Sequence, residues 1–112
     1  MTVDELQKAC GLSILICEDP EGLEQEITGC YIGDFLSWAM GKISAGNVWI
    51  TVMGNVNALA VAALTDAACI ILAEGASLDE EAEQKAKQQE ILVLTTEQSS
   101  YQLAIQIGEQ LN

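Results

Sequence analysis

The chain has 112 residues, of which 17 are acidic and four are lysines, and it contains neither arginine nor histidine. With a formal charge of −13, it lacks the positive surface that binding to nucleic-acid phosphates or to an anionic membrane requires. Histidine is the commonest general base and metal ligand, so its absence argues against both roles. We therefore expect a single domain, 1–112, with no metal, no cofactor and no nucleic-acid or membrane partner.

The N-terminal residues and the most apolar window bear on where the protein is located. Residues 1–5 have neither the basic nor the apolar region of a signal peptide, and the most apolar window, 59–73, is too short to span a bilayer. These features predict a cytoplasmic protein.

The chain has four cysteines, none of which forms a C-x-x-C pair: Cys10, Cys17, Cys30 and Cys69. We therefore interpret them as buried reduced thiols rather than a metal or redox site.

The N-terminal part of the chain contains one predicted helix and one predicted strand. Thr2 and Glu5 form a capping box that begins a short helix, and Gly11 is its expected stop. Residues 12–17 form the first predicted strand. The acidic segment 18–26 is interpreted as a solvated loop rather than a metal site.

The next segment predicts a strand followed by a second helix. Residues 27–32 are the predicted strand. We expect Asp34 to be the N-cap of a helix that runs through Met40, with its apolar side chains facing inward: Phe35, Leu36, Ala39 and Met40. Residues 41–47 are a turn.

The centre of the chain reads as one strand–helix–strand unit. Residues 48–53 are apolar and rich in β-branched side chains, which is typical of a strand buried on both faces. After a break at 54–55, residues 56–67 are rich in Ala and Leu and predict a helix. Residues 69–73 form a second buried strand. Such a unit is right-handed with parallel strands.

The C-terminal part repeats the alternation. A second capping box, Ser77 to Glu80, begins a helix that ends near Gln89, and 91–95 is a further parallel strand. A third capping box at 99–102 begins the last helix. Together the elements predict an α/β fold, a three-layer α/β/α domain with a small, mostly parallel sheet.

In a parallel sheet, ligands bind beside the loops that follow the carboxyl ends of the strands. Three such loops combine small or hydroxyl residues with the N-terminus of a helix, which favours an anionic ligand. A small molecule, such as an anionic metabolite, is therefore the expected ligand, although the same residues also suit helix caps and turns. The candidate ligand-binding residues are Gly54, Asn55, Asn57, Glu74, Gly75, Thr95, Thr96, Ser99 and Ser100.

Catalysis has little support in the sequence. Ser99 and Ser100 have no histidine to activate them, so we assign no catalytic residue. Glu74 is the best acid–base candidate, with Asp34 as a carboxylate that could face it. The alternative is that Glu74 is an exposed loop carboxylate.

The helix predicted at 56–67 is apolar on every side, which indicates that it is covered on every side. We predict a symmetric homodimer with this helix near the two-fold axis. The candidate interface residues are Ala58, Leu59, Val61 and Ala62. The alternative is that the acidic loop and the helix after Asp34 cover it within one chain.

Four segments together resemble the DRTGG domain family in its freestanding bacterial form: 29–40, 49–51, 57–75 and 91–95. The resemblance extends over nearly the whole chain. It implies an α/β/α domain, related in fold to the N-terminal domain of HPr kinase, that dimerises and has a non-catalytic regulatory role. The family's Asp-Arg pair corresponds to Asn55-Val56, and its Thr-Gly-Gly corresponds to Ala73-Glu74-Gly75, so that only the last glycine is kept.

Three functions follow as hypotheses. The first is a regulatory or ligand-sensing homodimer without catalytic activity. The second is an adaptor whose acidic surface binds a basic protein partner. The third is a small enzyme that uses Glu74 or Asp34.

Overall fold

The computed structural model describes residues 1–111 and contains one five-stranded sheet in the order β1-β5-β4-β3-β2. Strands β2 to β5 run parallel, and β1 pairs antiparallel with β5 at one edge. The sheet is thus mostly parallel, as predicted. The strands are β1 (Ser13–Ile16), β2 (Gly29–Ile32), β3 (Asn47–Thr51), β4 (Cys69–Leu72) and β5 (Val93–Thr95).

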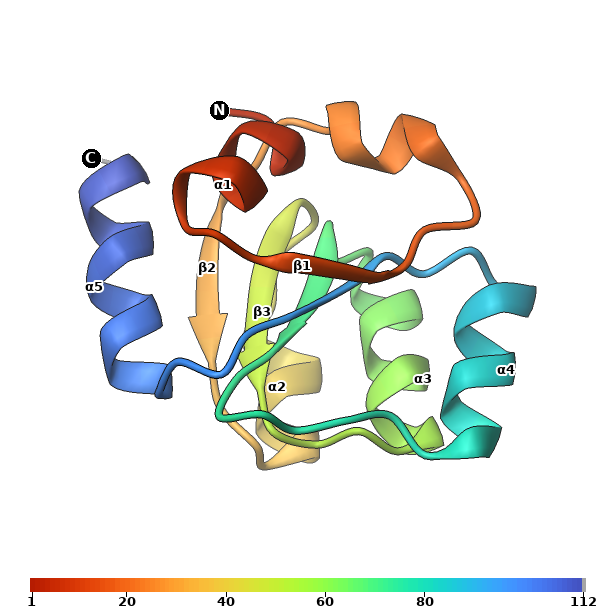
Figure 1. Ribbon diagram of the computed structural model, residues 1–112. Helices are drawn as coiled ribbons and strands as arrows, with labels where there is room; N and C mark the ends of the chain where they lie inside the picture. Colours follow the sequence, from red (N-terminus) through yellow and green to blue (C-terminus); the bar gives the residue numbers. More distant parts are fainter. Residues whose placement is uncertain (112) are drawn as a thin grey trace.

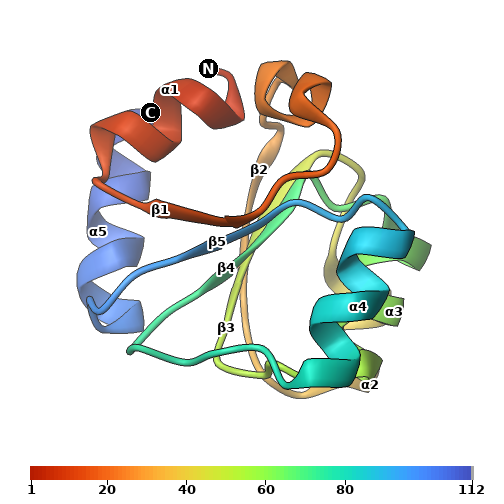
Figure 2. The same ribbon diagram turned by 45° about the vertical axis from the view of Figure 1, so that its right-hand side comes forward.

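Helices cover both faces of the sheet, which confirms the three-layer α/β/α architecture (Figures 1 and 2). Two helices lie on one face: α1 (Val3–Ala9) and α5 (Ser100–Leu111). Three helices lie side by side on the other: α2 (Leu36–Lys42), α3 (Val56–Thr65) and α4 (Glu80–Gln88). A short 3-10 helix, η1 (Pro20–Glu24), follows β1. Within residues 1–111, no helix combines the length and apolarity needed to cross a bilayer.

Alternating side chains of the strands form the two halves of the core. Val48 and Ile50 of β3 pack with α1 and α5, whereas Trp49 between them packs with α2, α3 and α4. All three are fully buried, as expected for a central parallel strand. The Trp49 indole N–H donates a hydrogen bond to the Gly33 carbonyl oxygen at 2.9 Å, so its buried polar group is satisfied.

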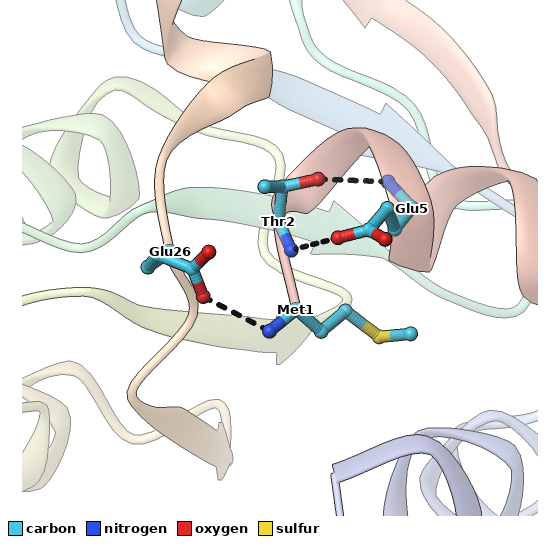
Figure 3. A network of polar contacts seen from close by, with 4 residues as sticks. All are labelled: Met1, Thr2, Glu5 and Glu26. Atoms are coloured by element: carbon cyan, nitrogen blue, oxygen red, sulfur yellow. Dashed lines mark hydrogen bonds and ion pairs between the residues drawn. The ribbon is translucent and has the colours of Figure 1, made fainter.

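The N-terminal capping box forms as predicted (Figure 3). The Glu5 amide donates to Thr2 Oγ1 at 3.2 Å, and the Thr2 amide donates to the Glu5 carboxylate at 2.9 Å. These bonds hold the pKa of Glu5 below its ordinary value. The Met1 ammonium group forms an ion pair with Glu26 at 2.9 Å, which joins the start of α1 to the segment before β2.

Two helix starts differ from the predictions. Phe35, not Asp34, is the N-cap of α2, and its ring has no acceptor atom for a side-chain capping bond. The Asp34 carboxylate binds the end of β3 instead. Phe35 and Met40 are exposed rather than inward. Asp79, not Ser77, is the N-cap of α4, and it accepts a hydrogen bond from the Ala82 amide.

The four proposed interface residues of α3 are buried within a single chain. Their exposed fractions are 5% or less, because α3 packs on the sheet between α2 and α4: Ala58, Leu59, Val61 and Ala62. They therefore cannot form the contact surface of a dimer, and the prediction of these residues as the interface is wrong. The outer side of α3 exposes Leu64, which is 73% accessible. The homodimer itself stays a prediction.

The four cysteines are all free, but only two of them are buried. Cys10 and Cys69 lie in the core, Cys17 is partly buried, and Cys30 on the edge strand β2 is exposed, contrary to the prediction. Burial raises the pKa of Cys69 far above its ordinary value, and it also raises the pKa of Cys10. Raised pKa values disfavour the reactive thiolate.

Candidate ligand-binding site

The carboxyl ends of the central strands lie level with one another. Thr51 of β3 pairs with Leu72 of β4, and Leu72 pairs with Thr95 of β5. The loops that leave these strands therefore emerge at one edge of the sheet, which we call the carboxyl edge: residues 33–35, 52–55, 73–79 and 96–99. The three predicted loops are all at this edge, where ligands of parallel sheets bind.

The loop after β4 contains an unusual turn at Glu74-Gly75. Both residues have left-handed backbone, with φ of 60° at Glu74 and 72° at Gly75. The Glu74 amide donates to the Gln98 carbonyl oxygen at 2.8 Å, and the Gly75 amide donates to the Thr96 carbonyl oxygen at 3.0 Å. Both amides thus bind the neighbouring loop and are not free to bind an anion.

The left-handed backbone of this turn carries an energetic cost that depends on the residue. A left-handed conformation costs glycine nothing, but it costs other residues about 1–2 kcal/mol. Glu74 is not a glycine, so this chain accepts that cost there. A Cβ atom on Gly75 would approach Glu97 Oε2 to 2.5 Å, so the flexible Glu97 side chain would have to move.

Gly54, in the loop after β3, is fixed by another close approach. A side chain there would collide with the Ser77 carbonyl oxygen, and the Gly54 carbonyl oxygen accepts a hydrogen bond from the Asp79 amide at 2.9 Å. The loops after β3 and β4 are therefore packed directly against each other. Ser77, which we predicted as a cap, instead forms part of this contact.

Several candidate residues have structural roles at the edge. Asn55 is the N-cap of α3, where its Oδ1 accepts from the Ala58 amide at 3.0 Å. Ser99 Oγ accepts from the Gln102 amide at the start of α5, and Thr96 Oγ1 accepts from the Gln98 amide. These bonds are the cap and turn roles that the sequence left open as the alternative.

The candidate carboxylates do not form a pair. Ser100 Oγ donates to Glu74 Oε2 at 3.3 Å, which brings these two candidates together. Asp34 instead accepts from the Thr51 hydroxyl at 2.7 Å and the Val52 amide at 3.0 Å. The remaining candidates include Thr95 at the end of β5 and Asn57 on the exposed side of α3. Among residues 1–111, no group of three or more His, Cys, Asp or Glu could hold a metal ion.

Sequence reasoning missed the contact between Asp34 and Thr51. Thr51 is the only polar residue of the buried core in the described chain, with 1% exposure. Its hydroxyl also accepts a hydrogen bond from the Met53 amide at 3.2 Å. A threonine at the end of a buried apolar strand was the available signal, because a buried hydroxyl requires a partner.

The carboxyl edge is acidic. Its loops carry four acidic residues and no lysine: Asp34, Glu74, Asp79 and Glu97. Lys42 and Lys87 lie in the last turns of α2 and α4, away from the carboxyl edge where both helices begin. Lys85, also in the last turn of α4, lines a depression together with Val56, the first residue of α3. The charge of these loops therefore favours a neutral or cationic group over a polyphosphate, contrary to the anionic metabolite expected from the sequence.

A depression lies between α3 and α4 and has a volume of about 300 Å³. Its lining combines Val56 with four long polar side chains of α4: Glu81, Gln84, Lys85 and Gln88. None of the candidate ligand-binding residues lines it, but Val56 lies between two of them, Asn55 and Asn57, so the depression adjoins the loop after β3.

Residues 1–111 form an α/β/α module in which the loops after the parallel strands emerge at one edge of the sheet. The DRTGG domain profile matches residues 10–109, and the chain therefore belongs to the DRTGG domain family. We found no match among curated protein sequences.

One solved structure has a similar fold, with a TM-score of 0.71 and 16% sequence identity. It is the crystal structure of the CBS and DRTGG domains of the regulatory region of Clostridium perfringens pyrophosphatase, complexed with the activator diadenosine tetraphosphate. The alignment covers 95% of this chain and 45% of the other, so this chain spans less than half the length of that structure.

Proposed function

We propose that this domain is a non-catalytic regulatory module that senses a small molecule at the carboxyl edge and acts as a cytoplasmic homodimer. The observation that carries the proposal is family membership, since the DRTGG domain of the solved relative belongs to the regulatory region of an enzyme. Glu74 and Asp34 have different hydrogen-bond partners, Ser100 for Glu74 and Thr51 for Asp34, and this arrangement supports a role without catalysis.

The ligand that we propose is neutral or cationic. The activator of the pyrophosphatase is a polyphosphate, and the carboxyl edge here has four carboxylates and no lysine to bind such a group. The Arg of the family motif corresponds to Val56 in this chain, which removes one further cation. A small molecule with hydroxyl, amide or amine groups would find acceptors in Glu74 and Glu97.

A thermal-shift screen tests this proposal. The panel contains amines, amides and sugars, with diadenosine tetraphosphate as the anionic comparison. We expect a neutral or cationic compound to raise the melting temperature, and we expect Glu97→Gln to weaken that rise because Glu97 lies at the edge. The matched control is Glu109→Gln, which changes the same charge on α5 far from the edge. A response only to the polyphosphate would contradict the charge argument.

An adaptor is the second candidate function, favoured by the distribution of acidic side chains. Five acidic residues lie in 18–26 around η1, and three lie in the first turn of α4. Figure 1 shows η1 and α4 on the side of the molecule away from β2 and α5. A basic partner would bind there, and co-purification that is lost at high salt would support this function.

A further inference from the structure

Large apolar side chains are exposed around the open edge strand β2. Phe35 and Trp38 at the start of α2 are 66% and 64% accessible, and Ile32 at the end of β2 is 46% accessible. The two rings lie 6.2 Å apart. α5, which contacts β2 on the opposite face of the sheet, adds exposed Tyr101 and Ile105 in its first two turns. We call these five side chains the β2-edge surface.

Their clustering follows from the topology. β2 and α5 lie side by side in Figure 1, and α2 follows β2 along the chain on the opposite face of the sheet. The carboxyl end of β2, the first turn of α2 and the first turn of α5 are all near the carboxyl edge, because each helix begins where a strand has ended. No described strand pairs with the outer side of β2. The surface therefore combines exposed rings with unpaired backbone groups, which is typical of an interaction site.

Few charged residues lie in the segment that contains β2 and α2, and the acidic residues nearest to the β2-edge surface are Asp34 beside Phe35 and Glu74 beside the start of α5. Residues 27–65 contain one acidic residue, Asp34, and one lysine, Lys42, so the rest of the chain carries the whole formal charge of −13. The Asp34 carboxylate is held by Thr51 and Val52. α5 adds a single charged residue, Glu109, in its second half.

We propose that the β2-edge surface is the contact through which two copies of this chain associate. Two chains of charge −13 repel each other over most of their surfaces, and the uncharged β2-edge surface is where they can meet with little repulsion. A two-fold axis brings a surface against itself, so Phe35 and Trp38 of each copy would bury apolar area while the open edges of β2 supply matching donors and acceptors. This inference rests on the homodimer of the proposed function and names its interface.

Salt dependence separates this interface from ion-pair docking. Added salt screens the repulsion between two acidic copies, so association through the β2-edge surface tightens as salt rises. Binding of a basic partner to the acidic residues around η1 and α4 would weaken under the same change. The sign of the salt effect therefore reports which kind of surface is used.

Sedimentation velocity on the full chain, across micromolar concentrations at low and high salt, is the test. We expect a dimer that tightens with salt, and we expect Trp38→Glu to weaken its association by about tenfold or more. The control is Leu64→Glu, since Leu64 of α3 is 73% exposed and lies outside the surface. Ile14→Glu on β1 is a second control, on the edge of the sheet opposite β2. Circular dichroism checks that each variant is folded.

The outcomes distinguish the interface from the proposed function. A wild-type dimer that Leu64→Glu or Ile14→Glu disrupts, and that Trp38→Glu leaves intact, overturns the β2-edge surface but keeps the homodimer. A wild-type monomer at every concentration overturns both, whereas ligand sensing is decided separately by the thermal-shift screen. Trp38 fluorescence supplies a second readout: Trp49 is fully buried, so a blue shift with concentration reports burial of Trp38.

Discussion

The Glu74-Gly75 turn allows a prediction in which neighbouring substitutions have opposite signs. Gly75→Ala places a Cβ at φ of 72°, which costs about 1–2 kcal/mol, and the reduced freedom of the unfolded chain returns about 0.4–1 kcal/mol. The contact with Glu97 Oε2 adds to the cost, although that flexible side chain can move. We expect Gly75→Ala to lower the free energy of unfolding by about 1 kcal/mol.

Glu74→Gly has the opposite effect because it relieves the same kind of strain. Removing the strain at φ of 60° raises the free energy of unfolding by about 1–2 kcal/mol, and the more flexible unfolded chain lowers it by about 0.5–1 kcal/mol. The hydrogen bond from Ser100 is exposed, so its loss costs little. We expect a net stabilisation of up to about 1 kcal/mol, which corresponds to a rise in melting temperature of about 4 °C.

Urea denaturation followed by far-UV circular dichroism measures both effects. The control is Gly41→Ala, since Gly41 lies inside α2 with ordinary backbone and open space around the added Cβ. That change is expected to stabilise the protein by about 0.5–1 kcal/mol. If Gly75→Ala stabilised the protein as Gly41→Ala does, the left-handed turn would not be the reason for the glycine.

The remaining predictions concern the core, the first helix and the thiols. Thr51→Val should lower the free energy of unfolding by about 1–3 kcal/mol in urea titrations, because the Asp34 carboxylate loses a donor and the Met53 amide an acceptor, whereas Thr51→Ser should cost less. The pKa of Glu5 is lower in the folded protein than its ordinary value of 4.5, so the ionised carboxylate stabilises the folded protein above pH 4.5. This contribution is lost as the pH falls through the folded-state pKa. Glu5→Gln should therefore flatten this part of the pH dependence of stability, measured by thermal denaturation. A thiol reagent at mildly alkaline pH should modify Cys69 last, and only as the protein unfolds, because burial both shields this thiol and raises its pKa. Rapid labelling of Cys69 in the folded protein would contradict that order.

Local sequence patterns sufficed for the central strands and for the caps whose partners are near in sequence. The β3–α3–β4 unit followed from two buried apolar runs around an alanine-rich helix, and Thr2 and Glu5 are only three residues apart. The DRTGG family could also be recognised from these segments. The carboxyl edge followed from the parallel order of the strands alone.

Contacts between distant segments could not be predicted in this way. Asp34 reads as a helix cap, but its carboxylate binds Thr51, 17 residues later, which local periodicity does not reveal. Ala58 and its neighbours read as an intermolecular surface, yet α2 and α4 cover that part of α3 within the chain. Apolar character shows that a helix is covered, and only the packing of the other helices shows what covers it.

An NMR titration of the isotope-labelled protein shows whether a ligand binds at the carboxyl edge. With the compound that gives the largest thermal shift, we predict amide chemical-shift changes centred on residues 33–35, 52–55, 73–79 and 96–99. Shifts centred instead on the groove between α3 and α4, around Val56 and Gln84, would contradict a ligand site at the ends of the parallel strands.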